Sequence, residues 1–121
     1  MPDEALAVHE SDVDGVRLLE VFGELDLATA PHLCARLDAA RAQRVRRIVV
    51  DLMGVDFCDS TGLRALMGAS TELRHAGGRL AVAVLPDGAV ARLFDVTGIR
   101  EALPVHDTQQ GALTSLTVLP T

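Results

Sequence analysis

The sequence predicts an α/β fold in which a mixed, mainly parallel β-sheet carries an N-terminal β-hairpin and about four helices. Two short runs, residues 48–52 and 80–84, are continuously apolar and rich in β-branched side chains, as in strands covered on both faces. Segments with helical spacing alternate with these runs, and parallel strands need such crossover connections. With 49% hydrophobic residues in 121, the chain can build a core, and we expect one domain over residues 1–121.

The chain opens with a predicted hairpin. A strand at residues 5–11 and a second at 16–22 flank Asp14-Gly15, a dipeptide that favours the tight turns of hairpins. A loop at residues 23–26 follows the second strand. The hairpin supplies the antiparallel part of the sheet.

The first predicted helix begins at Thr29 as its N-cap, has Pro31 in its first turn and ends near Gln43. Its apolar face consists of Leu33, Leu37 and Ala40. The run at 48–52 follows as the central strand, and residues 54–59 are predicted to be a loop.

The second half of the chain repeats the alternation of helix and strand. After a second helix, Gly77 and Gly78 lead into the strand at 80–84, and a third helix ends at Gly98. A short strand at 102–106 and a last helix at 108–119 complete the pattern. The apolar faces of the second and third helices consist of Leu63, Leu66, Met67 and Leu73, and of Val90, Leu93 and Phe94.

The composition excludes several kinds of function. All 11 basic residues are arginine, so the lysine of a phosphate-binding P-loop and any Schiff-base chemistry are absent. A net charge of −6, without tryptophan or tyrosine, argues against direct binding to nucleic acid. No segment has the length and hydrophobicity of a membrane span or signal peptide, so we expect a cytoplasmic protein without membrane contact. The two cysteines, Cys34 and Cys58, lack metal-ligand spacing, and we expect reduced thiols, no metal and no cofactor.

Chemistry-bearing side chains gather in the two loops that follow the second and the central strand. The first holds Glu24 and Asp26, and the second leads from Asp56 to Asp59 and Ser60. In α/β sheets the carboxyl ends of strands form the functional edge, so both loops are candidates for one site. Asp59 or Ser60 could act solely as a helix N-cap, but Thr61 follows directly, so at least one hydroxyl is surplus to capping. Ser60 lacks the nucleophile-elbow motif, and no catalytic residue is expected.

Four motifs in order resemble the STAS domain of bacterial anti-sigma factor antagonists. The resemblance runs from about residue 16 to residue 116. The motifs are Gly23-Glu24-Leu25-Asp26, Ile48-Val49-Val50-Asp51-Leu52, Phe57-Cys58-Asp59-Ser60-Thr61-Gly62-Leu63 and Leu93-Phe94-Asp95-Val96-Thr97-Gly98-Ile99. Cys58 departs from the family, which usually has a larger aliphatic residue there, and we expect a buried, inert thiol.

The resemblance implies a STAS-like sandwich and a regulatory role. Such a protein binds an anti-sigma factor, usually a serine kinase of the histidine-kinase-like ATPase fold, and so releases a sigma factor. Phosphorylation inactivates it, and the family's acceptor position maps onto Ser60; a serine phosphatase would restore the active form. The residues expected to meet the partner are Glu24, Asp26, Asp56, Asp59, Thr61, Gly62 and Leu63.

Two other functions remain open at this point. STAS domains also serve as non-enzymatic subunits of lipid-transport ATPases and in stress-sensing scaffolds, although those proteins often alter the acceptor motif that is intact here. Nucleotide binding by the domain itself is the other function, and the lack of a glycine-rich phosphate loop argues against it.

Overall fold

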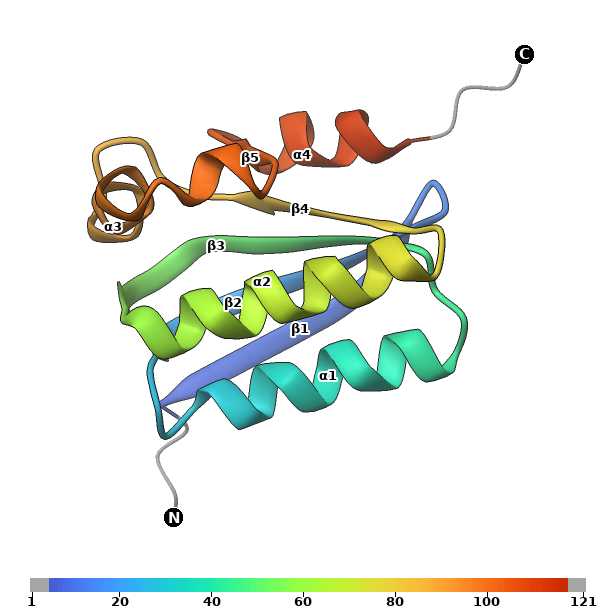
Figure 1. Ribbon diagram of the computed structural model, residues 1–121, viewed down its shortest axis with the longest axis horizontal. Helices are drawn as coiled ribbons and strands as arrows, with labels where there is room; N and C mark the ends of the chain where they lie inside the picture. Colours follow the sequence, from blue (N-terminus) through green and yellow to red (C-terminus); the bar gives the residue numbers. More distant parts are fainter. Residues whose placement is uncertain (1–4, 118–121) are drawn as a thin grey trace.

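The computed structural model describes residues 5–117 and contains one five-stranded sheet with its strands in sequence order (Figure 1). The first two strands are antiparallel, and all later neighbours are parallel. The predicted mixed sheet with an N-terminal hairpin is therefore confirmed. The strands are β1 (Leu6–Val13), β2 (Val16–Leu25), β3 (Arg47–Cys58), β4 (Arg79–Ala83) and β5 (Val105–His106).

The hairpin closes through the two residues that the sequence indicates. Val13 pairs with Val16, and the intervening Asp14 and Gly15 have φ values of 50° and 84°. Two successive positive φ values are typical of the type I′ turn, whose twist matches that of the strands. The first strand begins and ends slightly later than predicted, at Leu6 and Val13.

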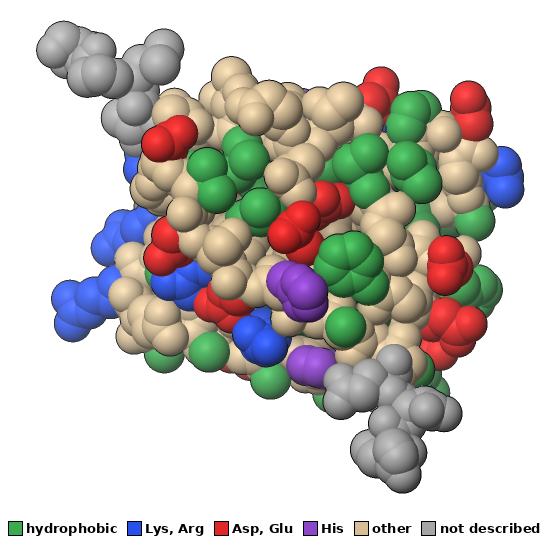
Figure 2. All heavy atoms as spheres, turned by 180° about the vertical axis from the view of Figure 1, so that it is seen from behind, with side chains coloured by type: hydrophobic (Ala, Val, Ile, Leu, Met, Phe, Trp, Pro, Cys, Tyr) green, Lys and Arg blue, Asp and Glu red, His purple; other side chains and the backbone are tan. Residues whose placement is uncertain are grey.

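Helices cover both sides of the sheet. Two long helices, α1 and α2, lie side by side on one face (Figure 1), and α4 packs on β3 and β4 from the other. Figure 2 shows this second side, where carboxylate, histidine and apolar side chains reach the surface near the middle. The helices are α1 (Ala30–Ala42), α2 (Ser60–His75), α3 (Ala89–Thr97) and α4 (Gln109–Leu116), with a 3-10 turn η1 (Ile99–Glu101).

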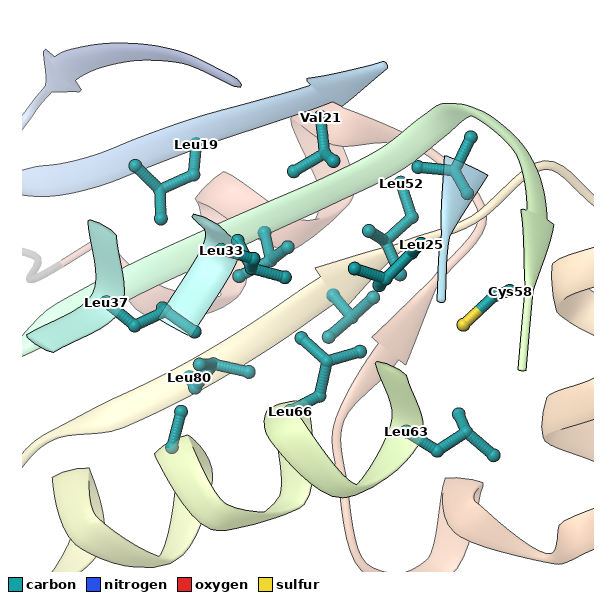
Figure 3. Close-up of a cluster of buried hydrophobic side chains, with 14 of the residues drawn as sticks. Leu19, Val21, Leu25, Leu33, Leu37, Leu52, Cys58, Leu63, Leu66 and Leu80 are labelled. Carbon is teal, nitrogen blue, oxygen red and sulfur yellow. The ribbon is translucent and has the colours of Figure 1, made fainter. Parts of the chain in front are cut away.

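The larger core lies between the sheet and the helices α1, α2 and α3. Leucine side chains from α1, α2 and the strands interdigitate there (Figure 3). Phe94 on α3 and Leu66 on α2 are fully buried in it. A smaller cluster under α4 joins Val49 on β3 to Leu113 and Leu116. Between them, these clusters bury the apolar faces of the helices and strands that the sequence predicts.

The segments predicted as loops at residues 23–26 and 54–59 are mostly strand, which corrects the sequence prediction. β2 continues to Leu25 and β3 to Cys58, and the register between them shifts twice. Glycine has a low propensity for β-strands. At position 54, however, any larger residue would clash, because a Cβ there would lie 2.4 Å from the Phe22 ring. A glycine in this strand therefore makes room for the aromatic side chain of its neighbour.

The helix ends agree with the sequence prediction at most positions. α1 ends at Ala42 before Gln43, and Gly98 adopts a left-handed conformation after α3. Thr29 precedes α1, but its side chain makes no cap; instead Oγ1 donates to the carbonyl oxygen of Glu24 (2.8 Å). The predicted strand at 102–106 is reduced to Val105–His106.

The last helix begins after Thr108, whose hydroxyl accepts the Gly111 N–H, and ends at Leu116. Thr117 is already its C-cap, and the predicted continuation through 118 and 119 lies outside the described residues. None of the helices described is long and apolar enough to cross a membrane.

Candidate functional site

The two chemistry-bearing segments meet at the carboxyl edge of the sheet. β2 and β3 are parallel, with Leu25 opposite Cys58, and the Asp59 N–H donates to the Leu25 carbonyl oxygen at 3.1 Å. Both segments therefore leave the same edge of the sheet, as a single site requires. Figure 1 shows α2 starting from this edge.

Asp59 and Ser60 divide the two roles that the sequence left open for them. Asp59 is the N-cap of α2: its Oδ1 accepts the backbone N–H groups of Thr61 (2.9 Å) and Gly62 (3.3 Å). Ser60 is the first residue of the helix and is exposed. Because the carboxylate does the capping, the Ser60 hydroxyl is left at the surface beside a helix N-terminus.

Glycine at position 62 lets the first turn of α2 pack closely against the ends of β2 and β3. A Cβ there would lie 2.8 Å from both Cys58 Sγ and Leu25 Cγ. Leu63 fills the adjacent space in the core (Figure 3). These contacts fix the position of Ser60, which lies two residues earlier.

Gly62 and Leu63 are buried, although both belong to the predicted partner-binding set. In this conformation they offer almost no surface to a partner. Thr61 is half-buried. Gly62 and Leu63 therefore lie beneath the surface that Ser60 belongs to, and Thr61 lies partly beneath it.

The four predicted carboxylates have different roles. Besides the capping Asp59, the Oδ1 of Asp26 accepts the N–H groups of Ala28 (3.0 Å) and Thr29 (3.1 Å), which shapes the turn into α1. Glu24 and Asp56 are exposed and form no ion pair with any of residues 5–117. Each therefore adds an unpaired negative charge to the edge that carries Ser60.

Exposed apolar side chains border the same edge, and sequence reasoning missed them. Leu27 in the turn after β2 is 74% exposed, and Phe57 near the end of β3 is 49% exposed. Leu85, which follows β4, lines a hollow of about 170 Å³ together with Asp56 and Val90. The sequence held one signal for this apolar surface, namely the large side chain of Phe57 beside charged residues. From the sequence alone, however, Phe57 could equally have faced the core.

The thiol beneath the site is inert. Cys58 is 7% exposed, which confirms its predicted burial. Burial, together with the Asp59 carboxylate, raises the pKa of Cys58 to about 12. The thiol is therefore protonated at neutral pH and is a poor nucleophile.

Within residues 5–117, no three histidine, cysteine, aspartate or glutamate side chains lie close enough together to hold a metal ion. Among the groups that the edge does present are the free hydroxyl of Ser60, the carboxylates of Glu24 and Asp56, and exposed apolar side chains. Such a surface suits contact with another protein.

Known proteins resemble the chain along most of its length. A family model of the STAS domain matches residues 9–112. An anti-sigma F factor antagonist from Paenibacillus polymyxa is 33% identical over 106 residues, which cover 87% of this chain and 90% of that protein. An anti-sigma-B factor antagonist from Staphylococcus aureus is 34% identical over 102 residues, with coverage of 84% and 94%.

A solved structure shows the same fold. The crystal structure of an anti-sigma factor antagonist from Mycobacterium paratuberculosis superposes with a TM-score of 0.83 at 31% identity. The match covers 92% of this chain and 93% of that one. The names of these relatives describe regulatory proteins and not catalysts.

Proposed function

The chain belongs to the STAS domain family, and from this premise we propose that it is an anti-sigma factor antagonist switched off by phosphorylation of Ser60. In its unphosphorylated form it binds an anti-sigma factor and so releases a sigma factor. The proposal treats residues 1–121 as one domain that acts in the cytoplasm through binding and not through catalysis.

The observation that carries this proposal is the free hydroxyl at the start of α2. Ser60 is exposed, and the adjacent Asp59 already satisfies the helix N–H groups that a serine could otherwise cap. A kinase can therefore reach the hydroxyl without disturbing the helix. The same position is the acceptor in the family motif that Asp59 to Leu63 match.

A phosphate on Ser60 would change the surface and not the fold. It adds about −1.5 to −2 charges, and the N-terminus of a helix favours an anion through its dipole and free N–H groups. Glu24 and Asp56 already make this edge negative. The modification therefore alters the charge and shape that a partner meets.

The partner we propose is an anti-sigma factor that is itself a serine kinase of the histidine-kinase-like ATPase fold. Its contact surface would bring cations towards Glu24 and Asp56, and apolar groups towards Leu27 and Phe57. A serine phosphatase would remove the phosphate and restore binding.

Calorimetric titration with the anti-sigma factor recovered by affinity capture from the protein's own cells tests this proposal. We expect Ser60→Ala to bind and Ser60→Asp to bind about a hundredfold more weakly, a loss of about 2.7 kcal/mol. Ser11→Asp is the matched control, because Ser11 is exposed on β1, near the hairpin turn. Equal affinity of Ser60→Asp and Ser60→Ala would contradict the proposed switch, and capture of a transport ATPase in place of an anti-sigma factor would contradict the proposed role.

A further inference from the structure

Arginine side chains gather at the end of the molecule opposite Ser60. In Figure 2 the blue side chains crowd the left-hand end, whereas carboxylates are frequent at the right-hand end. Arg47 and Arg79 begin β3 and β4 there, and Arg74 lies in the last turn of α2. For a chain of net charge −6, this local excess of cations is a departure from the average surface.

Arg47 and Arg79 are directly opposite one another. They are Cα partners on neighbouring parallel strands, which lie about 4.8 Å apart. Both are exposed, and neither forms an ion pair within the described part of the chain. Like charges directly opposite each other destabilise a sheet, so this pair costs stability unless an anion neutralises it.

Two adjoining hollows flank these arginines, and among residues 5–117 no carboxylate side chain lines either of them. The first, of about 250 Å³, is lined by Arg47, Gly77, Gly78, Arg79, Ser115, Leu116 and Thr117. The second, of about 490 Å³, shares Gly77, Gly78 and Arg79 and adds Arg74. Both arginines therefore line the first hollow, and Arg79 also lines the second, so the space beside them can hold a ligand larger than a single ion.

Neutralising the nearby helix ends does not account for this pair. Cations are favourable at helix C-termini, and both α2 and α4 end here. However, Arg46 Nη1 already donates to the Ala76 carbonyl oxygen after α2. At the end of α4, the hydroxyls of Ser115 and Thr117 donate to backbone carbonyl oxygens at 2.7 Å and 2.8 Å.

We propose that Arg47 and Arg79 bind a phosphate monoester carried by a small soluble molecule. Each guanidinium presents a planar fork of N–H donors. A carboxylate has two oxygens and is filled by one fork, whereas a phosphate monoester has three terminal oxygens and can accept from both. The hollow beside Arg74 has room for the rest of the molecule.

Amide chemical shifts of the full chain, followed by NMR during titration with inorganic phosphate and then with glycerol 3-phosphate, test this proposal. The ionic strength is held constant with sodium chloride. We expect saturable shifts at Gly77, Gly78 and the end of α4. Arg47→Gln and Arg79→Gln should each weaken binding about tenfold, with Arg47→Lys and Arg79→Lys in between because they keep the charge but lose the fork.

Arg92→Gln is the matched control, since Arg92 is an exposed arginine on α3 at the other end of the sheet, and it should bind like the wild type. Shifts that do not saturate, or that persist in the Arg47→Gln/Arg79→Gln double variant, would overturn the proposal. Binding to vesicles that contain phosphatidic acid, without binding to the free ester, would also overturn it, because the ligand would then be a lipid surface.

Discussion

At the scale of single residues, neighbouring positions around α2 have separate tasks. Asp59 holds the helix N-terminus, Ser60 presents its hydroxyl to solvent, and Gly62 lets the helix approach the strands. The sequence could identify this group but not divide its tasks, because aspartate and serine both cap helices. The choice depends on the extended backbone at Asp59, which tertiary contacts impose.

Residue chemistry also predicts an unusual dependence of stability on alkaline pH. The folded chain raises the pKa of Cys58 to about 12 from an unperturbed value of 9.0. Above pH 9 the unfolded thiol loses its proton while the folded one keeps it, so the unfolded state gains the advantage. We expect the free energy of unfolding to fall by roughly 1 kcal/mol per pH unit between about pH 9 and 12 from Cys58.

Urea unfolding followed by circular dichroism at several pH values would measure this slope. The sequence has no lysine and no tyrosine, and arginine stays protonated up to about pH 11. Below that pH the other side chain that titrates in this range is Cys34, whose pKa burial also raises. Cys58→Ala is the control and should flatten the slope. The same slope in both proteins would show that Cys58 is not its source.

At the scale of elements, β3 shows where sequence reasoning falls short. Its first half is an apolar run and was predictable, but its second half contains Gly54 and Asp56, which favour loops. The pairing with β2 and the ring of Phe22 keep this segment in the sheet. Such cross-strand contacts join residues about thirty positions apart and leave no local pattern. The exposure of Phe57 follows from the same contacts, so this part of the site could not be predicted.

The cap of α2 gives a prediction for this element. Asp59→Ala removes the acceptor for two backbone N–H groups and should lower the free energy of unfolding by about 1 kcal/mol. Asp59→Asn keeps an oxygen at the same place and should cost much less. Chemical denaturation of the three proteins compares them, and equal losses for both variants would assign the effect to charge and not to capping.

Two hydrogen bonds from one side chain, that of Gln109, hold the start of α4. Gln109 Nε2 donates to Asp51 Oδ2 (2.7 Å) and to Glu20 Oε2 (3.0 Å), and these two carboxylates are Cα partners on β3 and β2. Asp51 is 7% exposed, so loss of this donor leaves a buried carboxylate short of a partner. Gln109→Ala should lower the free energy of unfolding by roughly 1–3 kcal/mol.

The neighbouring Gln110 is the control for this variant. It is exposed and bonds to Thr114 within its own helix. Gln110→Ala should change stability little, and thermal unfolding of both variants provides the comparison. If Gln109→Ala were as stable as Gln110→Ala, the bridge would contribute nothing to the docking of α4.

At the scale of the whole molecule, the fold separates two charged ends. The carboxyl edge of the sheet carries Ser60 with Glu24 and Asp56, and the amino edge carries Arg47 and Arg79. The alternation of helices and strands predicted this architecture, because parallel strands place all their carboxyl ends on one side. The sequence could not give the strand order or the facing arginines, since both depend on which strands become neighbours.

The fold should also tolerate the proposed switch without loss of stability. Ser60→Asp places a carboxylate at the first position of α2, where the dipole favours it, and Ser60 contributes nothing to the core. We expect Ser60→Asp and Ser60→Ala to unfold cooperatively at nearly the same temperature as the wild type. A large drop in the unfolding temperature of Ser60→Asp alone would mean that the switch acts through unfolding.

Phosphorylation of Ser60 is tested most simply by intact-mass spectrometry of the protein purified from its own cells, with peptide mapping across residues 56–64 and a Ser60→Ala control. We expect a mass increment of one phosphate on Ser60 in part of the population, and its absence from the control. Protein that is unmodified under every growth and stress condition would rule out a phosphorylation switch at Ser60 and would favour a constitutive binding role for this domain.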